Sequence, residues 1–197
     1  MRSLPWLLAL VVLVGCGSSP PTRFYALDAV KPERPAASGT AVTPLKVDAV
    51  HIPPLLDRRS IVRREAGNQL DISSQDRWGA SFGEMMLGVL TQDLQSRLPM
   101  GAVIPSRAPA PPDARGLVVD ILSFVPNGSG EVELTCDWSF LEGAPAHPVL
   151  MRTTHLTQQA AETSPGQARA MSELVGKLAD QIAAAASRGQ DSTAAHR

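Results

Sequence analysis

Ten consecutive residues in the C-terminal half of the chain, 131–140, alternate strictly between polar and apolar side chains. Because side chains on a β-strand point alternately to opposite faces, this pattern predicts a strand with one buried and one solvated face. The residues predicted to face the core are Val132, Leu134, Cys136, Trp138 and Phe140. A sheet with one apolar face needs another layer over that face, and this requirement constrains the rest of the chain.

Other segments also have the composition of strands. In 45–52, the residues Leu45, Val47, Ala49 and His51 are expected to share one face. Segment 117–125 is apolar on both faces, which predicts a central strand covered on both sides. The remaining expected strands are 22–27, 60–64, 69–73, 102–104 and 149–156, with 60–64 and 69–73 forming a hairpin around 66–68.

Two segments have the spacing of amphipathic helices. The first begins at a capping-box pair, Ser81 and Glu84, and carries apolar residues every three or four positions up to residue 98. The second is expected to begin at Ser164, with Pro165 in its first turn and Gln167 completing a capping box, and to run to about residue 186. Both helices have an apolar stripe that would cover one face of a sheet.

The order of strands and helices predicts a single α/β domain over 22–187, with a mixed β-sheet packed by two main amphipathic helices. Segment 29–44 is rich in proline and has neither helical nor strand periodicity, so it is expected to be a mobile loop. The polar tail, 188–197, is expected to be disordered.

The N-terminus has the parts of a bacterial secretion signal over 1–15: Arg2, an apolar run from residue 4 to residue 14, and Gly15. The run is shorter than the about 20 residues of a membrane-spanning helix. The sequence Leu-Val-Gly-Cys that ends at Cys16 resembles the lipobox of bacterial lipoproteins, in which this thiol receives a diacylglyceryl group before cleavage. The alternatives are a plain signal peptide with an incidental cysteine, or a buried apolar N-terminus.

Lipidation of Cys16 would anchor the chain stably, because two or more acyl chains hold a protein on a membrane. Residues 16–21 would be the lipidated N-terminus and a short tether, which at ~3.5 Å per residue keeps the domain within about 20 Å of the bilayer. Gly17 follows the cysteine and no aspartate is near. By resemblance to lipoprotein sorting rules, this favours the periplasmic face of the outer membrane.

Charge and cysteine content exclude some classes of protein. The chain has 18 Lys and Arg against 19 Asp and Glu, and the signal contains only one of these residues, Arg2, so the mature chain has a net charge of −2. This balance gives no reason to expect a nucleic-acid partner. With Cys16 acylated, Cys136 has no partner for a disulfide within the chain.

The sequence contains no constellation that indicates catalysis or a metal site. It lacks the common zinc and phosphate-binding motifs, and its four histidines have no ligand spacing. The serine in the turn 127–130 is flanked by strands, whereas a nucleophile elbow lies between a strand and a helix. We therefore expect no catalytic residues, no metal and no cofactor.

Segment 52–64 combines a proline-broken strand, a charged turn and a strand that ends in two arginines. Prolines and charges of this kind protect strand edges from pairing with other chains. The alternative is a docking surface for an acidic partner or for anionic headgroups, because arginine suits carboxylate and phosphate.

Several features together resemble one family, the PqiC-like auxiliary lipoproteins of ABC-type transport systems. The similarity covers essentially the whole mature chain, and Arg59 is a departure, because the family often has proline there. The features are the lipobox Cys16, the early Arg23-Phe24-Tyr25-Ala26-Leu27, Ile52-Pro53, Leu56-Asp57-Arg58, Ile61-Val62-Arg63, Gly67-Asn68 and Arg77-Trp78 before a helix.

The resemblance implies an α/β domain similar to anticodon-binding-like folds, with no catalytic residues. It also implies a periplasmic partner, an MCE-domain protein of a lipid transport system, and leaves a homo-oligomer open. The residues that match its motifs, Asp57, Arg58, Arg63 and Trp78, are candidates for the partner surface, although Trp78 would equally suit the core beside the first helix. The main alternative is a structural or assembly-factor envelope lipoprotein unrelated to transport.

Overall fold

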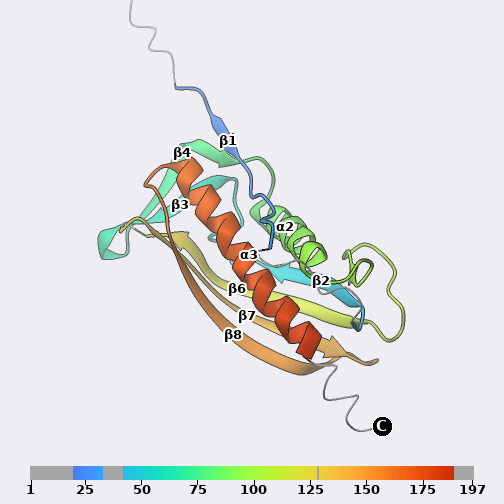
Figure 1. The fold of residues 1–197 in the computed structure, drawn as a ribbon. Coiled ribbons are helices and arrows are strands. Elements are labelled where there is room, and N and C mark those ends of the chain that lie inside the picture. Colours follow the sequence, from blue (N-terminus) through green and yellow to red (C-terminus); the bar gives the residue numbers. More distant parts are fainter. Residues whose placement is uncertain (1–19, 33–41, 128, 189–197) are drawn as a thin grey trace, which may run out of the picture.

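Two mixed sheets and two helices make up the described part of the chain in the computed structural model, which covers residues 20–32, 42–127 and 129–188 (Figure 1). This confirms the expected single α/β domain, with the strands divided between two sheets. The elements in chain order are β1 (Arg23–Tyr25), β2 (Leu45–His51), β3 (Ser60–Arg64), the short 3₁₀ helix η1 (Ala66–Asn68), β4 (Leu70–Trp78), α2 (Phe82–Arg97), β5 (Val103–Ile104), β6 (Arg115–Pro126), β7 (Glu131–Glu142), β8 (His147–Gln159) and α3 (Ser164–Arg188).

The larger sheet has five strands in the order β5-β2-β6-β7-β8. Strand β2 is parallel to both β5 and β6, whereas β6, β7 and β8 form an antiparallel meander. Helices α2 and α3 pack against each other and cover the same face of this sheet (Figure 1). The five alternating residues of β7 predicted to face the core are all buried, the most exposed being Trp138 at 2%.

Two expectations about the large sheet are wrong in detail. Strand β6 is central, but it is not covered on both sides, because both helices lie over one face; Leu122 on the other face is 55% exposed. The register of β2 shifts between Val47 and Ala49. Beyond this bulge the faces exchange, so Val50 packs against the core and His51 is exposed.

The smaller sheet has three strands in the order β1-β4-β3 and lies beside the N-terminal end of α3 (Figure 1). Strands β3 and β4 form the expected hairpin, and β1 is parallel to β4. The hairpin turn needs positive φ at two successive residues, Gly67 (69°) and Asn68 (64°), which glycine and asparagine tolerate best. This sheet brings the N-terminal strand next to the start of the C-terminal helix.

The two helices begin differently. The hydroxyl of Ser81 accepts a hydrogen bond from the Glu84 N–H at 3.3 Å, which confirms the expected N-cap of α2. The capping box expected at Ser164 and Gln167 is wrong, because Thr163 occupies the cap: its hydroxyl accepts from the Gly166 N–H at 3.3 Å. Ser164 and Gln167 are therefore free to point elsewhere.

Several predictions lie outside the described residues. These are the signal peptide, the lipidation of Cys16, most of the tether, the tail from residue 189 and the middle of the 29–44 loop. Within the part of the chain that the structure describes, no helix is both long enough and apolar enough to cross a bilayer.

Candidate functional site

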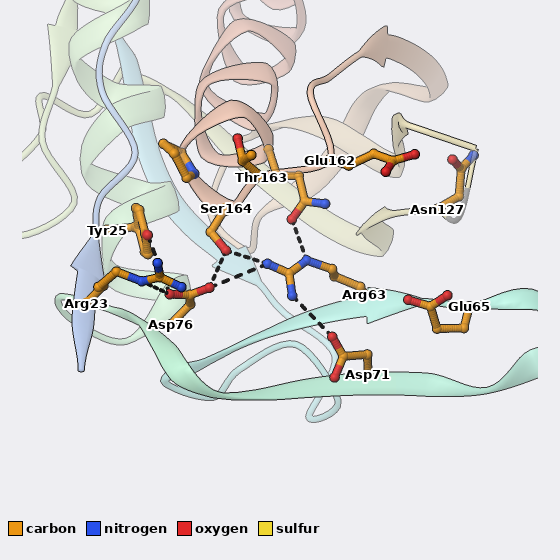
Figure 2. Close-up of a pocket in the computed structure, with 12 residues that line it drawn as sticks. Arg23, Tyr25, Arg63, Glu65, Asp71, Asp76, Asn127, Glu162, Thr163 and Ser164 are labelled. Atoms are coloured by element: carbon orange, nitrogen blue, oxygen red, sulfur yellow. Dashed lines mark hydrogen bonds and ion pairs between the residues drawn. The ribbon is translucent and has the colours of Figure 1, made fainter. Parts of the chain in front are cut away.

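A hollow of about 570 Å³ lies between the three-stranded sheet and the first turn of α3 (Figure 2). We call it the polar cleft. All three strands of the small sheet, the turn at Asn127 and the start of α3 contribute to its lining. Its charged lining residues are Arg23, Arg63, Glu65, Asp71, Asp76 and Glu162. The cleft thus joins segments that are distant in the sequence.

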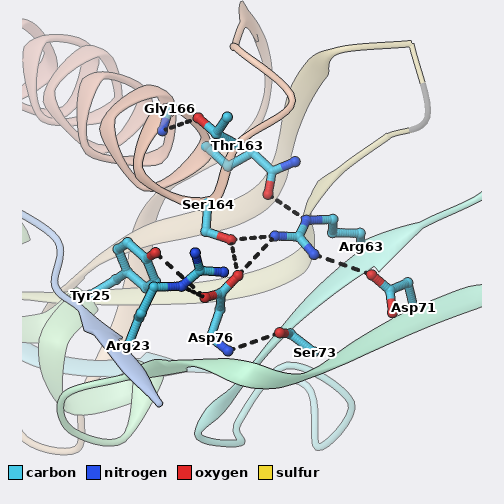
Figure 3. A network of polar contacts seen from close by, with 10 residues as sticks. Arg23, Tyr25, Arg63, Asp71, Ser73, Asp76, Thr163, Ser164 and Gly166 are labelled. Carbon is cyan, nitrogen blue, oxygen red and sulfur yellow. Dashed lines mark hydrogen bonds and ion pairs between the residues drawn. The ribbon is translucent and has the colours of Figure 1, made fainter. Parts of the chain in front are cut away.

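Arg63, on β3, has a partner for each of its three guanidinium nitrogens (Figure 3). Its Nε donates to Oε1 of Gln167 at 2.7 Å and its Nη1 donates to Oδ2 of Asp71 at 3.1 Å. Its Nη2 donates to the hydroxyl of Ser164 and lies 3.7 Å from Oδ2 of Asp76. An arginine with three occupied nitrogens positions the sheet against α3 and has little capacity left for a ligand.

Asp76, on β4, is the most enclosed charged member of this network, with 5% of its surface exposed. Its Oδ1 accepts from Nε of Arg23 at 2.7 Å, and its Oδ2 accepts from the hydroxyl of Ser164. Burial alone would raise the pKa of Asp76. The hydrogen bonds from Ser164 and Arg23, with the charges of Arg23 and Arg63, outweigh burial and lower this pKa below its ordinary value.

Arg23 connects β1 to this network, directly opposite Asp76 in the parallel ladder. The hydrogen bond and charge of Asp76 raise the pKa of Arg23 further above its already high value. Unlike Arg63, its side chain is 62% exposed, and only its Nε has a partner among the described residues. Its two Nη nitrogens have no hydrogen-bond partner among the described residues that line the cleft (Figure 2).

The structure separates the four residues predicted for a partner surface. Asp57 is exposed in the turn that follows β2, and Arg58 beside it is half-buried. Arg63 lies in the polar cleft. Trp78 is only 3% exposed, because its ring packs at 5.2 Å from that of Phe82; it belongs to the core, and its assignment to a surface is wrong.

Sequence reasoning missed Arg23, Asp76, Ser164 and Gln167 as parts of one network. Ser164 and Gln167 have the spacing of a capping box, which concealed their tertiary role. Asp76 carried no signal in the sequence, because it lies after the expected strand 69–73, in the part of β4 that has no alternating pattern.

A second polar cluster holds the segment after β1, residues 26–32, which we call the strap, beside α2 and α3 (Figure 1). Oδ1 of Asp93 accepts from the Val30 N–H at 2.7 Å, and Nη1 of Arg97 donates to the Val30 carbonyl at 2.9 Å. Ser172 accepts from the Asp28 N–H at 3.0 Å. Burial is the main reason why the pKa of Asp93 rises to about 6, and its Oδ2 has no partner in the described chain.

The polar cleft has the side chains of a binding site, with charged groups and hydrogen-bond donors and acceptors. No histidine or cysteine is among the described residues that line it. Cys136 is buried in the core, and burial raises the pKa of its thiol to about 12, so the reactive thiolate is strongly disfavoured. Within residues 20–32, 42–127 and 129–188, no group of three or more histidine, cysteine, aspartate or glutamate side chains could hold a metal ion.

Solved structures share this fold. An uncharacterized protein is similar over 86% of this chain and 99% of its own length, with a TM-score of 0.64 at 18% sequence identity. A protein from Xanthomonas campestris is similar over 87% of this chain and 99% of its own, with a TM-score of 0.69 at 14% identity. No curated protein sequence matches the chain.

The family described as the ABC-type transport auxiliary lipoprotein component matches residues 25–183. This range begins in β1 and ends near the end of α3, so it includes both sheets, both helices and most of the polar cleft. The chain therefore belongs to the family of ABC-type transport auxiliary lipoprotein components.

Proposed function

We propose that this protein is anchored to the periplasmic face of the outer membrane through lipid on Cys16. There it acts as the non-catalytic component that docks the periplasm-spanning MCE protein of an intermembrane lipid transport system. The observation that carries the proposal is the family match over residues 25–183, which makes the chain an auxiliary component of ABC-type transport. The MCE partner and the outer membrane come from the resemblance in the sequence and are the parts to be tested.

The geometry near the N-terminus supports a role that depends on anchoring. Arg23 is seven residues after Cys16, and at ~3.5 Å per residue the polar cleft lies within about 25 Å of the lipidated position. The Arg23–Asp76 ion pair and the strap fix the segment after the anchor to the folded domain. Anchoring would therefore restrict the position of the binding surface and raise the effective concentration of a partner.

The surface that we propose for docking is the exposed turn with Asp57 and Arg58. Nε of Arg58 is buried without a partner among the described residues. A buried donor of this kind costs stability until it is hydrogen-bonded, which a docked partner or water would achieve.

Fractionation tests the anchor. Cys16→Ala should move the protein from the outer-membrane fraction to the soluble periplasmic fraction, because alanine has no thiol to carry the acyl chains that anchor the protein. Cys136→Ala is the matched control and should stay with the membrane, since Cys136 is buried in the core. Continued membrane fractionation of Cys16→Ala would contradict lipidation, and recovery of the native protein with the inner membrane would contradict the outer-membrane assignment.

Site-specific photocrosslinking tests the partner. A probe at Asp57 should capture an MCE-domain protein, whereas a probe at the fully exposed Met100 should not. The alternative function, a structural or assembly-factor envelope lipoprotein, predicts that the probe at Asp57 recovers peptidoglycan-associated or assembly proteins and no MCE protein.

A further inference from the structure

The charges of the polar cleft do not cancel. Two arginines and four carboxylates line it, and the network pairs Arg23 and Arg63 with Asp71 and Asp76. Glu65 and Glu162 have no cation partner among the described residues. The cleft therefore has an excess of two negative charges, which disfavours a simple anion such as free phosphate.

The excess is not spread evenly through the cleft. Glu65 and Glu162 lie at one end, with Asn127, whereas Arg23 lies at the opposite end (Figure 2). The Nη nitrogens of Arg23 remain available because only its Nε is used. A ligand that fits both ends carries an anionic oxygen group at one end and a cationic hydrogen-bond donor at the other.

The closeness of Arg23 to the proposed lipid anchor in the sequence favours a lipid headgroup as the ligand. Arg23 is seven residues from the predicted lipid anchor, while Glu65 belongs to the β3–β4 turn, beyond the network. In phosphatidylethanolamine the phosphate is attached next to the glycerol and the primary ammonium group is outermost. A headgroup entering past Arg23 would present its charges in the order in which the cleft complements them.

We propose that the polar cleft binds the phosphoethanolamine headgroup of phosphatidylethanolamine. The phosphate contacts the guanidinium of Arg23, and the ammonium group donates to the carboxylates of Glu65 and Glu162. The volume of about 570 Å³ is within the ~300–1,000 Å³ of ordinary small-molecule sites, so a headgroup fits with space for water. This inference rests on the proposed membrane location for its supply of lipid, but binding itself requires neither the anchor nor an MCE partner.

Calorimetric titration of the full mature lipoprotein in detergent tests the proposal with soluble probes. Glycerophosphoethanolamine should bind more tightly than ethanolamine, inorganic phosphate or glycerophosphoglycerol, because only it engages both ends of the cleft. It should also exceed glycerophosphocholine, whose quaternary ammonium donates no hydrogen bond. Equal or tighter binding of phosphate or glycerophosphoglycerol would overturn the proposal. Tighter binding of pentalysine would also overturn it and identify a basic partner chain as the occupant.

Glu65 and Glu162 lie outside the Asp76 network, so substitutions at these two residues separate binding from folding. The double variant Glu65→Gln with Glu162→Gln should weaken glycerophosphoethanolamine binding about tenfold, since each exposed charge contact contributes up to about fivefold. Glu133→Gln, on the open face of the large sheet, is the matched control and should bind normally. Arg23→Lys should retain more affinity than Arg23→Gln, because it keeps the positive charge.

The two proposals fail in different ways. If the double variant binds the probe as tightly as the native protein, the headgroup site is wrong whether or not the protein docks an MCE partner. If the probe binds as expected but Asp57 crosslinks no MCE protein, only the docking function is wrong.

Discussion

Two aspartates are almost inaccessible to solvent, but their pKa values shift in opposite directions. Asp76 joins the small sheet to α3, and Asp93 joins α2 to the strap. They are 5% and 0% exposed, yet the pKa of Asp76 is lowered and that of Asp93 is raised to about 6. Depth of burial therefore does not decide which form of the carboxyl group the fold favours.

The difference lies in the donors that surround each carboxylate. Both oxygens of Asp76 accept hydrogen bonds, from Arg23 and Ser164, and a second guanidinium, that of Arg63, is near. Asp93 receives the Val30 N–H and Arg97 on one oxygen, while the other oxygen has no partner among the described residues. Asp180 adds a second negative charge beside the Asp93 cluster, which further opposes its ionisation.

Removing the charge of Asp76 should have the largest effect on stability. Asp76→Asn leaves Arg63 and Arg23 without the carboxylate with which both form ion pairs. Loss of one partner from an enclosed ion pair costs about 3 kcal/mol. We expect the free energy of unfolding to fall by about this amount, measured by urea denaturation at pH 7.

Asp71→Asn is the matched control for this comparison. It also removes a carboxylate from Arg63, but that side chain is 48% exposed, so the loss should be below about 1 kcal/mol. Equal losses in the two variants would show that enclosure does not separate the two contacts.

The raised pKa of Asp93 predicts a pH dependence of opposite sign. Its folded-state pKa of about 6 lies above the ordinary aspartate value of ~3.9. Over this window the folded protein retains a proton that the unfolded chain releases, so stability should fall as the pH rises from about 4 to about 6. The contribution from Asp93 is about 2 kcal/mol, and Asp93→Asn should remove this part of the pH profile.

Asp76 acts in a different pH window. Its folded-state pKa is lowered, so it contributes stability above the ordinary aspartate pKa, and this contribution is lost as the pH falls through the lowered value. Urea unfolding of the native protein and Asp93→Asn at pH 4, 5, 6 and 7 measures the difference. Parallel profiles for the two proteins would contradict the account of Asp93.

Sequence patterns predicted the parts of the fold that depend on local periodicity. The alternation in β7 identified the buried face correctly, because a sheet covered on one side imposes a period of two. The same reasoning failed in β2, where a bulge after Val47 exchanges the faces. It also could not recognise that β4 extends to Trp78, because residues 74–78 combine polar side chains with an enclosed aspartate.

The polar cleft depends on contacts that no local pattern contains. Arg63 meets Ser164 across 101 residues of sequence, and Arg23 meets Asp76 across 53. Arg63 was selected from its motif as a surface residue, whereas the fold uses its guanidinium to join β3 to α3. Ser164 and Gln167 matched a capping box, but the adjacent Thr163 supplies the cap, so a shift of the capping residue by one position changes their role.

The smallest expected effect comes from Gly176→Ala, which tests how closely the strap packs against α3. A Cβ at Gly176 would lie 3.1 Å from Cβ of Val30 and 3.2 Å from Nη2 of Arg97, so Gly176→Ala must displace the strap or the guanidinium. We expect the free energy of unfolding to fall by about 1 kcal/mol, the lower end of the cost of overpacking.

Gly88→Ala, in α2, is the matched control. Nothing lies within 4 Å of a Cβ at Gly88, so this substitution should instead stabilise the protein by about 0.5 kcal/mol through helix propensity. Hydrogen exchange at the Val30 amide should rise in Gly176→Ala and stay unchanged in Gly88→Ala; an equal gain in stability in both variants would show that the strap does not press on α3.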